Sequence, residues 1–97
     1  MRGIVAAVQA DQLPGEELVT AGLRDLARGI HSTEALLVSI GASRLRDLGF
    51  PVSEPIAEPE LRLYELLSRE SPDGAHSRYN ALIRRLVSFE RAAECAS

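Results

Sequence analysis

The feature that most constrains the fold of this chain is an apolar stripe near its C-terminal end. Between residues 74 and 93, apolar side chains recur at alternating steps of three and four residues, with mostly polar side chains between them. This is the period of an α-helix that buries one side. A single helix cannot cover its own apolar stripe, so the pattern predicts a helical bundle. The stripe consists of Tyr79, Leu82, Leu86, Phe89 and Ala93.

Three earlier segments also have helical patterns, over residues 14–29, 32–48 and 59–70. Gly41 interrupts the second of them, which predicts two short helices or one bent helix. Pro51, Pro55 and Pro59 make residues 49–59 an extended connector. We therefore expect one all-α domain over residues 1–97, a bundle of four to five helices in two hairpin-like pairs joined by this connector. Residues 1–13 are expected to form an N-terminal arm or a short helix.

The composition excludes several classes of protein. Aromatic residues make up only 4% of the 97 residues, so the core must be aliphatic, and the net charge of −3 argues against a role centred on nucleic acid phosphates. All basic residues are arginine, which is typical of a GC-rich genome, and we expect a bacterial source. The single cysteine, Cys95, cannot form an internal disulfide, and no apolar stretch is long enough to span a membrane. We therefore expect a cytoplasmic protein.

The segment 59–70 carries apolar residues on two faces. Leu63, Leu66 and Leu67 form one stripe, while Leu61 and Tyr64 point elsewhere. In a short chain, such a helix is either central to the core or part of an interface. Glu90 lies within the apolar arc of the last helix, where it would need an arginine partner or access to water. The expected interface consists of Leu61, Tyr64, Tyr79, Leu82, Phe89 and Glu90.

These patterns lead to a functional hypothesis. The chain would be a small cytosolic protein–protein interaction or adaptor protein without catalysis, either a homodimer or the helical partner of a larger protein. Residues 33–48 suggest an alternative, in which a short helix-turn-helix makes the chain a DNA-binding or antitoxin-like regulator. In that case Arg44 and Arg46 would face the DNA.

The remaining polar residues give little indication of a catalytic or ligand-binding site. His76 and Arg78 lie at the start of the last helix, where an anion could bind. No cysteine or histidine has metal-ligand spacing to His31 or His76, and no phosphate-binding loop is present, so we expect no metal and no cofactor. A nuclease that uses His31 or His76 is a third hypothesis.

Overall fold

The computed structural model describes residues 13–96, which form five helices and no strand. The expected arm or short helix at residues 1–13 lies almost wholly outside the described residues. The expected all-α bundle is confirmed. The helices are α2 (Glu16–Ala27), α3 (Thr33–Ile40), α4 (Ala42–Asp47), α5 (Pro59–Glu70) and α6 (Ala75–Ala96).

The helix ends follow from local chemistry. Ser32 caps α3, because its side-chain oxygen accepts a hydrogen bond from the backbone N–H of Ala35 at 3.1 Å. The Ser32 hydroxyl also donates a hydrogen bond to the carboxylate of Asp25 at 2.7 Å. Pro59 opens α5 at its first turn, where the missing N–H costs nothing. Gly41 separates α3 from α4, so the interrupted pattern of residues 32–48 corresponds to two short helices.

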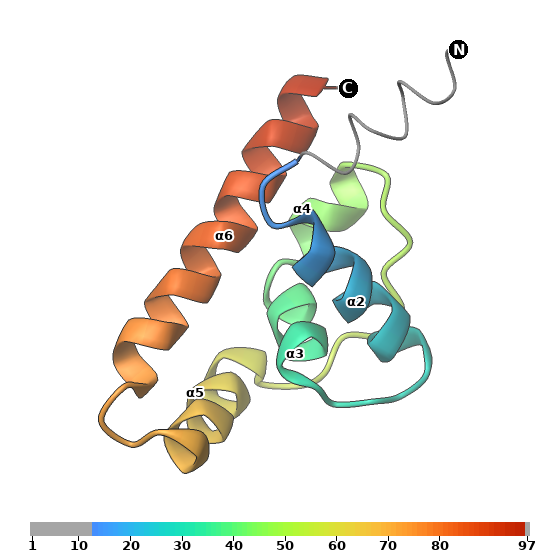
Figure 1. Ribbon diagram of the computed structural model, residues 1–97. Coiled ribbons are helices and arrows are strands. Elements are labelled where there is room, and N and C mark those ends of the chain that lie inside the picture. The colour runs from blue at the N-terminus through green and yellow to red at the C-terminus, as the bar shows by residue number, and fades with distance from the viewer. Residues whose placement is uncertain (1–12, 97) are drawn as a thin grey trace.

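Helix α3 is the centre of the molecule. It contacts α2, α5, α6 and α4, and four consecutive residues of it, from Ala35 to Val38, are at most 3% exposed. A helix that is apolar on all sides belongs in a core. Figure 1 shows α6 as a long diagonal helix, with α4 beside its upper part, α2 and α3 beside its middle and α5 beside its lower end. The α5–α6 hairpin is therefore covered by α3 along only part of its length.

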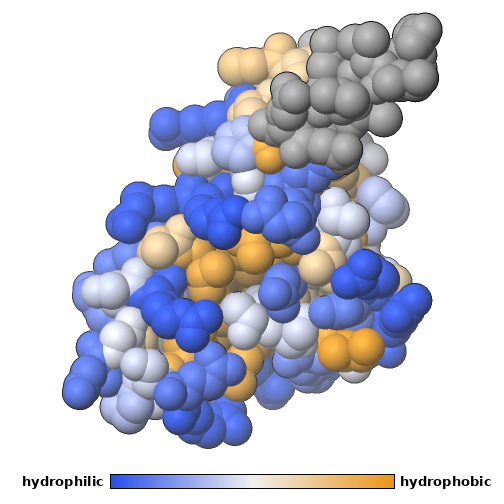
Figure 2. Space-filling model, in the orientation of Figure 1, coloured by the Kyte–Doolittle hydropathy of each residue, from blue (hydrophilic) through white to orange (hydrophobic). Residues whose placement is uncertain are grey.

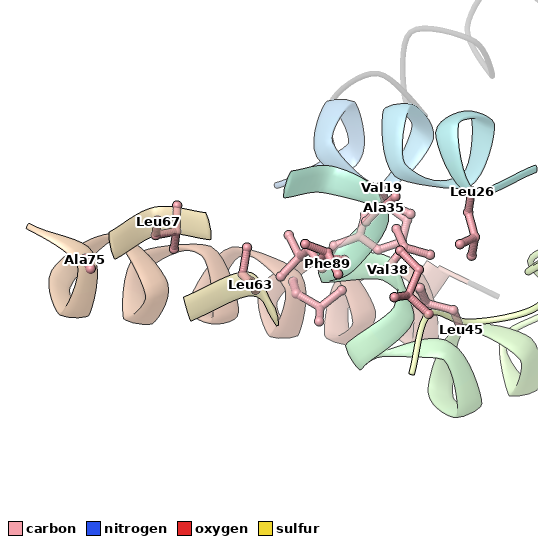
Figure 3. Packing of buried hydrophobic residues seen from close by; sticks show 13 residues of the cluster. Val19, Leu26, Ala35, Val38, Leu45, Leu63, Leu67, Ala75 and Phe89 are labelled. Atoms are coloured by element: carbon pink, nitrogen blue, oxygen red, sulfur yellow. The ribbon is translucent and has the colours of Figure 1, made fainter. Parts of the chain in front are cut away.

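The core is aliphatic with one large aromatic side chain, as the composition indicates. Figure 3 shows Val19 and Leu26 of α2 pointing toward Val38 of α3, while Leu63 and Leu67 lie between α5 and α6. Phe89 of α6 is 2% exposed and packs at the centre of this cluster, with its ring centroid 5.3 Å from that of Phe50 in the connector. These contacts join helices from both sides of the connector into one apolar core.

Helices α2 and α3 approach each other closely at Gly22. A β-carbon built at this glycine would lie 2.4 Å from the carbonyl oxygen of Glu34 and 2.4 Å from a methyl group of Val38. Only glycine fits between the two backbones at this distance. The contact sets the position of α3, against which α5 packs.

The connector between α4 and α5 is held by polar contacts at both ends. The buried hydroxyl of Ser39 accepts a hydrogen bond from the backbone N–H of Ile56 at 3.0 Å and donates one to the carbonyl of Ala35. The guanidinium of Arg46 donates to the carbonyls of Val52 and Ser53, each at 3.1 Å. These contacts hold the connector against α3 and α4.

Candidate functional site

Helix α5 has one buried face and one exposed apolar face. Leu63 and Leu67 are 0% exposed, whereas Leu61 is 55% exposed and Tyr64 is 39% exposed. Leu61 and Tyr64 are three residues apart, so they are neighbours on the helix surface. We call this pair, together with the surrounding exposed side chains of α5, the outer face of α5. The two apolar faces expected for residues 59–70 are therefore present, and the helix that occupies the centre of the core is α3.

The aromatic residues of the hairpin connect this outer face to α6. The rings of Tyr64 and Tyr79 are tilted against each other with centroids 5.7 Å apart, an arrangement that aromatic pairs favour. Tyr79 is half-buried, and burial raises the pKa of its phenol, with the nearby carboxylate of Glu60 raising it further. The contact keeps Tyr64 in place at the edge of the outer face.

A cleft runs along the same helix, between α5 and the start of α3. Its walls include His31 and Leu36 on one side and, on the other, the N-cap residue Glu58 with the α5 side chains Leu61, Arg62, Glu65, Leu66 and Arg69. Four of these residues are charged, with alternating sign. No other described residue forms an ion pair within 4 Å with any of the four; the ion pairs of residues 13–96 are Arg24–Asp25, Arg44–Glu94, Arg78–Glu70 and Arg85–Glu17.

Other apolar surface lies elsewhere on the molecule. Ile30 is 46% exposed in the loop after α2, and Val87 is 36% exposed on α6. Figure 2 shows hydrophobic side chains between α6 and α2 on the face drawn there, with more of them lower down, over α5. An apolar hollow lined by Leu23, Phe50 and Phe89 lies on the α2 side of the core. The outer face of α5 differs from these surfaces because its apolar pair lies beside a row of charges.

Two residues of the expected interface are inside the molecule. Phe89 is 2% exposed and Glu90 is 8% exposed, so neither forms part of a free surface, whereas Tyr79 and Leu82 are half-buried beside the core. Phe89 is buried because the connector folds back over it through Phe50. We therefore restrict the candidate interface to Leu61 and Tyr64, with Tyr79 as a support.

Glu90 lies against the junction of α3 and α4. Its carboxylate reaches to within 2.7 Å of where a β-carbon of Gly41 would lie. Burial raises the pKa of Glu90, and attraction to Arg44 offsets part of this rise. Arg44 itself donates a hydrogen bond to Glu94 at 2.6 Å. The arginine that attracts Glu90 is thus itself hydrogen-bonded to Glu94, and Glu90 has little access to water. The charged form of Glu90 is therefore disfavoured.

The two arginines of the helix-turn-helix hypothesis make contacts within the chain. Arg44 of α4 pairs with Glu94 of α6, and Arg46 of α4 holds the connector through two carbonyls. Helix α4 itself has only six residues, which leaves little length for reading base edges in a groove. Both arginines are exposed in part, but their guanidinium groups bind α6 and the connector.

The histidines lie on separate parts of the molecule. His31 lies in the loop between α2 and α3, and His76 lies in the first turn of α6. Figure 1 shows these two segments on opposite sides of α5. His76 shares a hydrogen bond of 3.2 Å with Asn80, and Arg78 pairs with Glu70 at 3.1 Å. The polar cluster at the start of α6 is therefore occupied by contacts within the α5–α6 hairpin.

Two other kinds of feature are absent from the described part of the chain. Residues 13–96 contain no group of three or more histidine, cysteine, aspartate or glutamate side chains placed to hold a metal ion. None of the helices in this part of the chain has the length and apolar character needed to cross a membrane. Comparison with protein-family models, curated proteins and solved structures finds no match to this chain.

The outward position of Leu61 and Tyr64 was predicted from the sequence, whereas the charged row beside them was not. Arg62, Glu65 and Arg69 follow each other at steps of three and four residues, which places them on one side of α5, and Glu58 is the N-cap residue four positions before Arg62. This spacing is visible in the sequence and is the signal that would have identified the row. The opposite wall of the cleft, at His31 and Leu36, comes from a distant segment and depends on the tertiary fold.

Proposed function

We propose that this chain is a small helical interaction protein and that another protein covers the outer face of α5. The chain would act as a homodimer or as the helical partner of a larger protein, without catalysis of its own. The observation that carries this proposal is the 55% exposure of Leu61 beside Tyr64, on a helix whose opposite face is fully buried. Burying these two side chains against a partner would remove apolar surface from water, and the charges beside them would form the polar rim of the interface.

We also propose that the protein works in the reducing environment of the cytoplasm. Cys95 is exposed and free near the end of α6. An exposed free thiol is stable in a reducing compartment and prone to oxidation in an oxidising one.

Site-specific photocrosslinking tests the interaction. A photoreactive amino acid in place of Leu61 should produce covalent adducts with protein when the chain is expressed in its source cell. The matched control carries the same group at Asp47, an exposed position on α4, which lies at the other end of the molecule from α5 (Figure 1). Adducts from position 61 that are absent from position 47 support the proposal. Equal adducts at both positions, or none at position 61, would refute it.

A measurement of stability tests whether Leu61 serves binding rather than folding. Leu61→Ser replaces a half-exposed side chain and should change the free energy of unfolding of the monomer, measured at a protein concentration too low for self-association, by no more than about 1 kcal/mol. A large loss of stability in Leu61→Ser would instead mean that Leu61 is needed for the fold, contrary to its exposure.

A further inference from the structure

The charged row, made of the N-cap residue Glu58 and three residues of α5, reads the same in both directions when the signs are exchanged. Its order along the chain is Glu58, Arg62, Glu65, Arg69, that is, negative, positive, negative, positive. The outer pair and the inner pair are both centred between residues 63 and 64. All four side chains are exposed and line one cleft.

A row with this symmetry is complementary to itself when reversed. In an antiparallel pair of identical helices related by a twofold axis, a contact from residue i to residue j is repeated from j to i. With the axis between residues 63 and 64, Glu58 of one copy meets Arg69 of the other, and Arg62 meets Glu65. Every charge in the row then faces an opposite charge, and the twofold repeats each pair.

The apolar residues fit the same arrangement. Leu61 and Tyr64 lie beside the charged row and close to its centre, so Leu61 of one copy comes near Tyr64 of the other. The centre of this apolar pair is one residue from the centre of the charged row, so Leu61 of one copy and Tyr64 of the other are offset by two residues, about 3 Å along the helix axis. Apolar residues at the seam with charges beside them are the pattern by which helices choose partners and direction.

We infer that the occupant of the outer face of α5 is a second copy of this chain, paired antiparallel through α5. The inference rests on the proposed function, since it names the partner for the same face. The register is set by the Glu58–Arg69 and Arg62–Glu65 pairs between copies, and Leu61 and Tyr64 provide the apolar contact. Each α5–α6 hairpin would then lie against the hairpin of the other copy.

Charge reversal tests the register. Light scattering after size exclusion should show a dimer for the unaltered protein. Arg62→Glu and Glu65→Arg should each weaken the dimer by roughly ten-fold or more, because each places like charges together twice in the twofold interface. The double variant Arg62→Glu/Glu65→Arg should restore dimerisation to within about three-fold of the original. The matched control Asp47→Arg, on exposed α4, should leave the dimer unchanged.

Mixing the two single variants separates interface effects from effects on the helix itself. An equimolar mixture of Arg62→Glu and Glu65→Arg should form more dimer than either variant alone, since opposite charges then meet across the interface. A change in helix stability within one copy could not be rescued in this way. Failure of the mixture to dimerise, while the unaltered protein dimerises, would overturn the antiparallel register.

The outcomes also separate this inference from the proposed function. A protein that stays monomeric up to hundreds of micromolar, yet gives adducts with a different protein from position 61, refutes self-pairing and leaves the interaction function standing. A monomer with no adducts from position 61 refutes both. Adducts between two copies from position 61, together with rescue in the mixture, support both.

Discussion

Substitution of Gly22 by alanine gives the sharpest test of the described packing. In an isolated helix, this change would stabilise the helix by about 1 kcal/mol. In this protein, the new β-carbon would lie 2.4 Å from the carbonyl oxygen of Glu34, whereas real β-carbons essentially never come closer than 3.0 Å. The obstacle is backbone, which cannot rotate away, so overpacking should cost about 3 kcal/mol. The net loss is about 2 kcal/mol, or a fall of about 10 °C in Tm for a domain of this size.

Thermal and urea unfolding followed by far-UV circular dichroism measure this loss. Thr20→Ala is the matched control, because Thr20 is exposed on the same helix and the change only raises helix propensity. The control should be equal to or slightly more stable than the unaltered protein. If Gly22→Ala is as stable as the control, α2 and α3 do not approach as described, and the reasoning fails.

Three further predictions concern polar groups, each measured by urea unfolding. Ser39→Ala should cost about 1–3 kcal/mol, because the buried N–H of Ile56 loses its acceptor, while Ser43→Ala on exposed α4 should change stability by less than about 0.5 kcal/mol. Ser32→Ala should cost about 1 kcal/mol through loss of the α3 cap, and an unchanged stability would contradict that cap. Folding raises the pKa of Glu90 above 4.5. The contribution of its protonated form to the free energy of unfolding is therefore fully present below pH 4.5, and it is lost as the pH rises through the folded pKa. Glu90→Gln should therefore be more stable than the unaltered protein at neutral pH and equal to it in acid; equal stability at both pH values would refute the raised pKa.

The helices could be predicted from the sequence because their boundaries depend on neighbouring residues. Ser32 as a cap, Gly41 as a break and Pro59 as a first-turn residue each act within one turn of the helix. The period of residues 79–93 likewise depends only on spacing. These signals need no knowledge of which helices pack together, so they hold before any tertiary structure is known.

The central place of α3 was not predicted, because it depends on distant contacts. The consecutive apolar residues 35–38 indicate a helix that is buried all round, but the close approach that allows this needs Gly22 from another helix. The burial of Phe89 and Glu90 also depends on the connector and on α4, which fold back over α6 from more than 30 residues away. Periodicity identifies the buried side of α6, but it does not tell which residues at its margins are covered.

An exposed leucine alone says little about binding, since apolar atoms make up much of any protein surface. The charged row points to a partner only if its four charges do not form ion pairs with one another. Glu65 and Arg69 are four residues apart with the glutamate first, which is the spacing that favours ion pairs within one helix, and the N-cap residue Glu58 precedes Arg62 by the same number of residues. In the structure neither pair comes within 4 Å, and among residues 13–96 none of the four has another ion-pair partner. Four charges beside an exposed apolar pair are therefore available to a partner, and their order is complementary to a reversed copy of itself.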